Sequence, residues 1–262
     1  MAEQTWETAI TKVEPNRLTI RGYRLEDLLG RVSFAEAIYL ILKGELPAPP
    51  VGRLMEAILV ASIDHGPTPP STLAARTAAS TGAPLNAALA AGVLSINRHH
   101  GGAIEACLQL LQKAVALKRD SGRSVAETAA EMVQAARREG RRLPGYGHRI
   151  HTADPRTQKL LALAREAGIE GDFVEMARAI EAAIARETGK NLPLNVDGAI
   201  AALLCELEFP AELANAIFMM ARLPGLTAHV YEEITTQKPM RRISPTAHVY
   251  CGPAEKTLAP DP

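Results

Sequence analysis

The spacing of apolar positions along the chain indicates a protein built almost entirely of helices. Apolar side chains recur every three or four residues, the period at which side chains share one face of a helix. The clearest stripes run over residues 104–115, 173–184 and 213–220. After Tyr23 no β-rich run of any length interrupts them. We therefore expect an all-α fold.

Turn-forming and helix-capping residues divide this pattern into elements. Pro15-Asn16 lies between two short β-prone segments, which predicts a small hairpin before the helices. Ser33 is a good helix cap before an apolar stripe that ends at Gly44. A second helix is expected over residues 52–63, and an alanine-rich helical stretch over residues 71–96.

Composition and charge exclude several classes of partner. The chain has 262 residues, enough for a large core, and is 47% hydrophobic and 22% charged, as ordinary globular proteins are. Its 29 Lys and Arg residues balance 29 Asp and Glu residues. The net charge therefore gives no reason to expect a nucleic acid or a membrane surface as partner.

The cysteines and the apolar runs bear on cellular location. Cys107, Cys205 and Cys251 are far apart, with neither metal-ligand spacing nor a disulfide framework, which favours a reducing compartment. The first residues form no apolar signal core, and no apolar run approaches the ~18 residues of a membrane helix. We expect a soluble cytoplasmic protein that binds no metal.

Candidate chemistry lies where the helices are interrupted. Four interruptions place His, Asp or Arg beside Gly or Pro: DHGP at 64–67, HHGG at 99–102, PGYGHR at 144–149 and NVDG at 195–198. Taken singly, such a His or Asp is more often a helix cap or a turn residue. Together they supply several imidazoles and a carboxylate, the groups that proton transfer requires.

Other catalytic classes fit less well. The sequence has no Gly-x-Ser-x-Gly nucleophile elbow and no His-Glu-x-x-His zinc motif. It also has no glycine-rich strand-to-helix fingerprint for a dinucleotide or a nucleoside triphosphate.

The order of the motifs is specific. DHG, HHGGA, GYGHR, DPR, NVD and AR follow one another, with about fifty residues between the second and third and again between the third and fifth motifs. This order resembles the citrate synthase superfamily. RGYRLEDL at 21–28 and FAEAIYLILKGELP at 34–47 resemble the N-terminal segments of that family, so the resemblance covers the chain from about residue 21 to residue 242.

The resemblance implies a site and an architecture. By carry-over onto matching motifs, the catalytic residues are His100, His148 and Asp197, and the residues that bind the substrate carboxylates are His65, Arg156 and Arg222. The glycine-rich turn suggests that Gly145, Gly147, Arg149 and Arg142 bind coenzyme A, which enters as part of a thioester substrate rather than as a resident cofactor. The family's architecture implies a homodimer with a large domain (1–103 and 205–262) and an inserted small domain (104–204) that closes over the substrates.

The local sequences favour one branch of the superfamily. DHGP and NVDGAI resemble the citryl-CoA lyase module of ATP-citrate lyase and free-standing citryl-CoA lyases, whereas synthases usually carry Glu after the first His and an aromatic pair after the Asp. The family's Arg-Pro, which reaches the neighbouring subunit's site, is Lys238-Pro239 here, and Arg241 and Arg242 follow as replacements.

Three functions therefore remain. The first is cleavage of citryl-CoA to acetyl-CoA and oxaloacetate, with a separate citryl-CoA synthetase left open as a partner. The second is citrate synthase or a related condensing activity. The third is a non-catalytic subunit that binds CoA esters.

Overall fold

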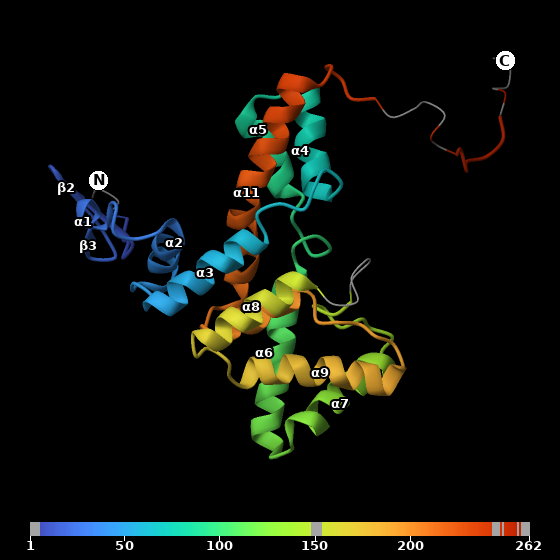
Figure 1. Cartoon of the computed structure of the whole chain (residues 1–262). Coiled ribbons are helices and arrows are strands. Elements are labelled where there is room, and N and C mark those ends of the chain that lie inside the picture. The colour runs from blue at the N-terminus through green and yellow to red at the C-terminus, as the bar shows by residue number, and fades with distance from the viewer. Residues whose placement is uncertain (1–5, 148–153, 243–246, 248, 256, 258–262) are drawn as a thin grey trace, which may run out of the picture.

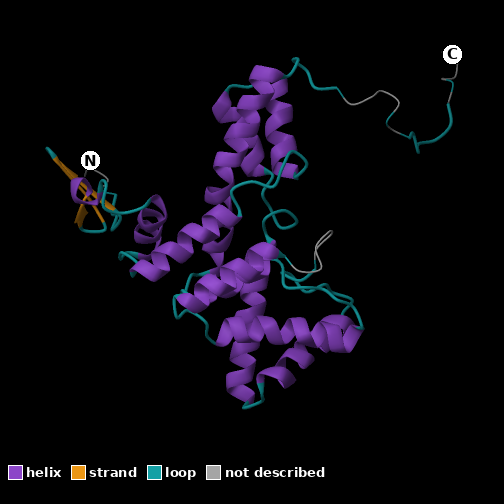
Figure 2. Ribbon diagram, viewed as in Figure 1, coloured by secondary structure: helices purple, strands orange, loops and turns teal. Residues whose placement is uncertain are grey.

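The computed structural model describes residues 6–147, 154–242, 247, 249–255 and 257. In these residues the chain forms three short strands and eleven helices (Figures 1 and 2). The strands are β1 (Thr11–Glu14), β2 (Arg17–Ile20) and β3 (Tyr23–Arg24). The helices are α1 (Leu25–Leu28), α2 (Phe34–Lys43), α3 (Pro49–Ala61), α4 (Pro70–Ser80), α5 (Leu85–Leu94), α6 (Ala103–Ser121), α7 (Val125–Arg138), α8 (Pro155–Glu166), α9 (Asp172–Thr188), α10 (Val196–Glu206) and α11 (Ala211–Thr236).

The expected hairpin is confirmed and is slightly larger than predicted. β1 and β2 pair antiparallel around a turn in which Asn16 has a positive φ of 59°. Asparagine tolerates this left-handed conformation better than most residues. β3 adds a third antiparallel strand beside β2. The helical part of the chain begins directly after it.

Helix boundaries follow the capping residues, with two refinements. Ser33 and Glu36 form a capping box at the start of α2, and Gly44 ends that helix in the left-handed conformation, as predicted. α3 begins at Pro49, three residues before the expected start, because proline fits the first turn of a helix. The alanine-rich stretch forms two helices, since Gly82 and Pro84 lie in the break between α4 and α5.

The helices gather into two regions joined by α11. Figure 1 shows α4 and α5 beside the C-terminal half of α11, and α6, α7, α8 and α9 in a second group, in which α6 contacts α11. α11 has 26 residues, so it spans roughly 39 Å at 1.5 Å per residue. This helix is long enough to reach from one region to the other.

Two hydrophobic cores hold these regions together. The larger core combines side chains of α6 to α10 with residues of α3 and α11, such as Leu54 and Ile217. The smaller core lies among α4, α5 and α11, where Ala75, Ala88 and Leu226 are fully buried. The division into a large domain and an inserted small domain stays a prediction. In the described part of the chain, no helix has the length and apolar character needed to cross a membrane.

Candidate active site

A small pocket forms where α8, α10 and α11 approach the loop between α3 and α4 and the turn before α6. Its volume is about 160 Å³. Five of the residues singled out from the sequence line it: His65, His100, Arg156, Asp197 and Arg222. They come from positions up to 157 residues apart in the chain, and the fold brings them together.

His100 is presented by a tight turn. The backbones of Asn97 and His100 exchange two hydrogen bonds, of 2.8 and 2.9 Å. Gly101 follows with φ of 88°, and a Cβ atom there would lie 2.6 Å from the Ile96 side chain. A side chain at this position would clash, so glycine is required for the turn that carries His100.

The imidazole of His100 has a defined partner and a partly buried environment. Its Nε2 atom lies 2.7 Å from Oγ of Ser71, a fully buried residue of α4. The ring also packs edge-on against Phe218, with centroids 6.1 Å apart. Burial lowers the pKa of His100, and the positive charges of Arg222 and His65 lower it further. The neutral imidazole is therefore favoured.

Arg222 is a buried cation in the middle of α11, with only 4% of its surface exposed. Its Nε donates to the backbone carbonyl of Ser62 at 2.9 Å, and the guanidinium lies over the Phe218 ring, 4.8 Å from its centroid. These contacts fix the side chain but leave several N–H donors of the guanidinium for a substrate carboxylate.

The loop that carries His65 is anchored to α11. The Asp64 carboxylate accepts from the Gly66 amide at 2.9 Å and lies 3.1 Å from His229 Nε2. Gly225 of α11 permits this approach, because a Cβ atom there would lie 2.4 Å from the Ile63 carbonyl oxygen. The loop and helix are thus closely packed, which holds His65 at the pocket.

Arg156 is oriented by Asp154, the N-cap residue of α8. The Asp154 carboxylate accepts from the Arg156 amide at 3.0 Å and from its guanidinium at 3.1 and 2.8 Å. Although burial acts to raise the pKa of Asp154, the hydrogen bonds from Arg156 hold it below its ordinary value. Asp154 is 1% exposed, so the ion pair is a rigid support for the Arg156 guanidinium.

Asp197 lies in the first turn of α10 and does not cap that helix. The cap is Asn195, whose side-chain oxygen accepts from the Gly198 amide at 3.1 Å. Burial raises the pKa of Asp197 above its ordinary value, even though the nearby charges of Arg156 and Arg222 act to lower it. A buried carboxyl with a raised pKa in a pocket is a strong candidate for proton transfer.

The glycine-rich turn at 144–147 packs directly against the start of α10. The Asn195 amide donates to the Gly145 carbonyl at 3.0 Å, and its side chain donates to the Gly147 carbonyl at 2.9 Å. A Cβ atom at Gly198 would lie 2.4 Å from the Gly145 carbonyl oxygen, so both glycines are needed for this contact. The chain thus runs toward His148 and Arg149, two predicted site residues that lie outside the described residues.

A larger basic pocket of about 690 Å³ adjoins the same turn. Gly147 and Arg142, both predicted from the sequence to bind coenzyme A, line it. Arg137, Arg141 and Lys190 add three further positive side chains to its wall. The Gly147 amide already donates to the Pro193 carbonyl at 2.7 Å, so Gly147 offers open space rather than a free N–H donor.

Arg241 and Arg242 are not brought to the small pocket of their own chain. They follow the C-terminal end of α11, which lies roughly 21 Å from Arg222 at 1.5 Å per helical residue. Arg241 forms an ion pair with Glu233, a buried residue that also pairs with Arg76 at 2.8 Å. Arg242 is exposed.

Sequence reasoning missed two residues that hold the side chains of the small pocket in place, Ser71 and Asp154. Ser71 gave no signal, because a serine in an alanine-rich helix has no distinctive spacing. Asp154 does carry a sequence signal, since Asp before Pro is typical of a helix start. Its hydrogen bond to Arg156, however, is visible only in the structure. Among the described residues, no cluster of three or more His, Cys, Asp or Glu side chains could hold a metal ion.

The fold and the pocket define a class of protein. A mostly helical scaffold presents one buried and one half-buried guanidinium group, those of Arg222 and Arg156, beside a neutral imidazole and a carboxyl with a raised pKa. Guanidinium groups suit substrate carboxylates, whereas the imidazole and the carboxyl suit proton transfer. Such a site fits an enzyme that acts on small polycarboxylates.

Comparison with known proteins identifies the family. The family model described as "Citrate synthase, C-terminal domain" matches residues 47–243. The chain belongs to the citrate synthase family. A solved structure of citryl-CoA lyase from Hydrogenobacter thermophilus is 45% identical, with a TM-score of 0.89 and 98% of each chain covered.

Two curated relatives are more distant. Citrate/2-methylcitrate synthase of Bacillus subtilis is 31% identical over 92% of this chain and 63% of its own length. ATP-citrate synthase beta chain protein 1 of Oryza sativa is 28% identical over 72% of this chain and 33% of its own length. The chain thus spans between a third and just under two thirds of these two relatives.

Proposed function

We propose that this chain is a citryl-CoA lyase, which cleaves citryl-CoA to acetyl-CoA and oxaloacetate. The observation that carries the proposal is the convergence of His100, Asp197, Arg156 and Arg222 on one pocket. The similarity to citryl-CoA lyase from Hydrogenobacter thermophilus, at 45% identity over 98% of both chains, supports the lyase direction.

Asp197 is the proton donor in this direction. Cleavage breaks the bond between the carbinol carbon and the adjacent methylene and leaves the electron pair on the acetyl-CoA fragment as an enolate. That carbon then takes a proton from Asp197. Burial raises the pKa of Asp197, which favours the protonated carboxyl that this step consumes.

His100 stabilises the thioester oxygen as negative charge develops on it. If the Ser71 hydroxyl donates to Nε2 across their 2.7 Å contact, a neutral imidazole carries its own hydrogen on Nδ1. That N–H then donates to the thioester oxygen. The lowered pKa of His100 supports the neutral form, and a donor fixed before the reaction needs little reorganisation.

The remaining groups bind and prepare the substrate. Arg156, Arg222 and His65 receive the carboxylates of the citryl group, with the two guanidinium groups held by Asp154 and the Ser62 carbonyl. His148 takes the proton of the tertiary hydroxyl, so one proton leaves oxygen while another is delivered to carbon. The reaction therefore balances without a metal or a redox partner.

The coenzyme A moiety occupies the basic pocket beside residues 143–147. Arg142, Arg137, Arg141 and Lys190 neutralise its phosphates, while Leu143 and Leu192 offer apolar surface. Arg149 belongs to the same proposal through its place after the glycine-rich turn. The pocket volume of about 690 Å³ is suited to a ligand of nucleotide size.

The second candidate is citrate synthase activity, because the same groups run in reverse form the carbon–carbon bond. The 31% identity to the Bacillus subtilis synthase favours it as the alternative. A non-catalytic CoA-ester-binding subunit, the third possibility, would have no use for the raised pKa of Asp197 or the hydrogen bond between Ser71 and His100.

One product analysis separates these functions. The purified chain is incubated with citryl-CoA, and separately with acetyl-CoA and oxaloacetate. Acetyl-CoA and oxaloacetate formed from citryl-CoA without free citrate support the lyase. Free citrate and CoA would instead identify a synthase, and no turnover in either assay would indicate a binding subunit.

The proposal extends to assembly and location. A homodimer is favoured by apolar side chains exposed on adjacent helices: Leu73 of α4, Leu85 of α5, and Tyr231 and Ile234 of α11. The widely spaced cysteines favour a cytoplasmic location. The proposed substrate, citryl-CoA, would be supplied by a separate citryl-CoA synthetase.

A further inference from the structure

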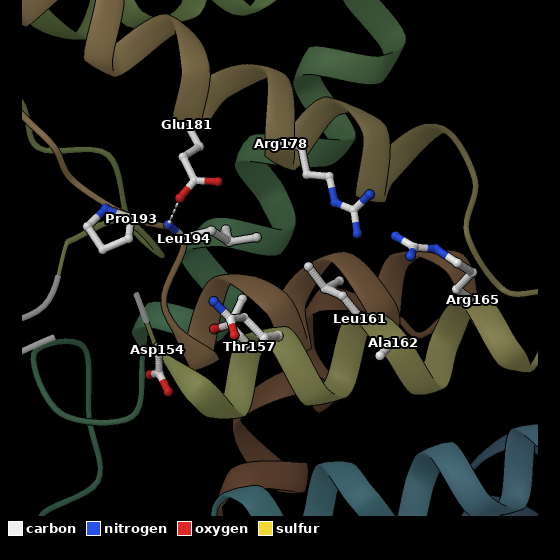
Figure 3. A pocket seen from close by; sticks show the side chains of 10 residues that line it. Asp154, Thr157, Leu161, Ala162, Arg165, Arg178, Glu181, Pro193 and Leu194 are labelled. Atoms are coloured by element: carbon white, nitrogen blue, oxygen red, sulfur yellow. Dashed lines mark hydrogen bonds between the residues drawn. The ribbon is translucent and has the colours of Figure 1, made fainter. Parts of the chain in front are cut away.

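A third pocket lies between α8 and α9 and shares no lining residue with the substrate pocket or the basic pocket. Its volume is about 440 Å³. In Figure 3, side chains from the two helices face each other across it, and residues 193 and 194 close one end. Nothing in the proposed lyase reaction uses this space.

One end of the pocket carries an excess of positive charge. Arg165 of α8 and Arg178 of α9 point toward one another there (Figure 3). Both donate to the same carboxylate, that of Glu170, each at 3.0 Å. Two guanidinium groups that share one carboxylate leave one net positive charge and several N–H donors. This end suits a ligand carboxylate.

The other end carries negative charge. Glu181, one helical turn beyond Arg178 on α9, uses one oxygen to accept from the Leu194 amide at 2.8 Å (Figure 3). A carboxylate can accept further hydrogen bonds. The nearby Asp154 is already neutralised by Arg156. Thr157 Oγ1 in the wall is buried and has no hydrogen-bond partner among the described residues, although buried hydroxyls usually have one.

We propose that this pocket binds an acidic amino acid. Its side-chain carboxylate lies between Arg165 and Arg178, and its ammonium group binds Glu181. Its α-carboxylate accepts from the Thr157 hydroxyl. Arg178 and Glu181 are three positions apart on α9, so they lie on the same face of the helix. A ligand that contacts both needs opposite charges only a few bonds apart, as the ammonium and side-chain carboxylate of glutamate are.

The pocket is connected to the substrate site through its wall. Asp154 forms part of the wall and holds Arg156. Leu194 forms another part and directly precedes Asn195, the cap of the helix that carries Asp197. A ligand that bridges α8 and α9 therefore restrains the start of α8, which carries Arg156, and the start of α10, which carries Asp197. The bound amino acid changes the affinity of the substrate pocket.

The test measures binding directly, by calorimetric titration of the intact protein with L-glutamate. Arg178→Gln should weaken binding about tenfold or more, the effect of losing one charged hydrogen bond. Arg165→Gln tests the same contact from α8. Arg186→Gln is the matched control, since Arg186 is an exposed residue of α9 that pairs with Glu187 and does not line the pocket.

A second comparison tests the ammonium contact. Glu181→Gln keeps an oxygen that can accept from the Leu194 amide but removes the charge. Wild type should prefer L-glutamate to glutarate, which lacks the ammonium group, and Glu181→Gln should lose this preference. Absence of glutamate binding to wild type, or binding that Arg178→Gln and Arg165→Gln leave unchanged, overturns the proposal. A loss of glutamate affinity that keeps growing as the oxaloacetate concentration rises would also overturn it, because competition for one pocket has no limit whereas coupling between two sites saturates. None of these readouts depends on lyase turnover.

Discussion

Burial favours the uncharged form of two titratable groups in the small pocket, Asp197 and His100. It raises the pKa of Asp197 and lowers the pKa of His100. The raised pKa of Asp197 retains a proton that can be given to carbon. The lowered pKa of His100 keeps the imidazole neutral, and a neutral imidazole can still donate a hydrogen bond. At the residue scale, the desolvated pocket prepares the acid and the hydrogen-bond donor together.

Asp197→Asn should remove the carbon acid while leaving the fold intact. We expect turnover to fall about 10²–10⁴-fold, the range for general acid–base groups. Exchange of the acetyl-CoA methyl protons with deuterated water, in the presence of an unreactive oxaloacetate analogue, measures this step directly. Because Asn195 caps α10, the variant keeps its helix cap. A folded variant that exchanges at the wild-type rate would show that the mechanism is misassigned.

Ser71→Ala should reduce turnover by orienting His100 less well. Loss of one hydrogen bond of roughly 1–1.5 kcal/mol predicts a decrease of about tenfold. A hydroxyl that donates to Nε2 stabilises the neutral ring, so its removal should raise the pKa of His100 and move the acidic limb of the pH–rate profile to higher pH. Ser80→Ala is the control, since Ser80 is also buried on α4 but bonds the Thr77 carbonyl. Equal effects of the two variants would indicate a structural role only.

At the scale of elements, the sequence predicted most helices, and it predicted the turns and caps that end them more accurately than the helices themselves. The hairpin, the Ser33 cap, the Gly44 stop and the start of α10 at Asn195 all follow from local chemistry. The sequence pattern does not predict the split of the alanine-rich stretch at Gly82, because alanine favours helix throughout and carries little periodic signal. The motifs predicted five of the residues that line the pocket, whereas Ser71 and Asp154 depend on tertiary contacts that no local pattern encodes.

Two neighbouring arginines in the segment after α11, Arg241 and Arg242, are expected to have different roles. Arg241→Ala should destabilise the protein, because Glu233 is buried and keeps only Arg76 as an ion-pair partner. A hydrogen bond from Arg241 lowers the pKa of Glu233, so this stabilisation is present at neutral pH and is lost as pH falls through the acidic range. Denaturant unfolding at two pH values measures it.

Arg242→Ala, by contrast, should leave stability unchanged and raise the KM for the polycarboxylate substrate. This follows if Arg242 reaches the neighbouring subunit's site in place of the family's Arg at Lys238. An unchanged KM in a stable Arg242→Ala protein would remove Arg242 from the binding set.

At the scale of the whole molecule, the exposed apolar side chains of α4, α5 and α11 predict a dimer at micromolar concentration by light scattering. Tyr231→Lys, on α11, should weaken association, because a charge would be buried at the interface. Val13→Lys on β1 is the control, since Val13 is equally apolar and 74% exposed but lies on the hairpin. A fully active wild-type monomer would contradict the prediction.

The burial of Asp197 also implies a trade-off between activity and thermal stability. Folding raises the pKa of this carboxyl, so the ionised group opposes folding, and stability declines as pH rises above the ordinary range of an aspartate. Asp197→Asn should therefore melt at a higher temperature than wild type, with a gap that widens from acidic to neutral pH. A residue proposed to be catalytic would then be one whose loss makes the protein more robust. A stabilised variant obtained by selection for heat resistance alone should be checked first at this position, because the gain in melting temperature there comes with the loss of turnover.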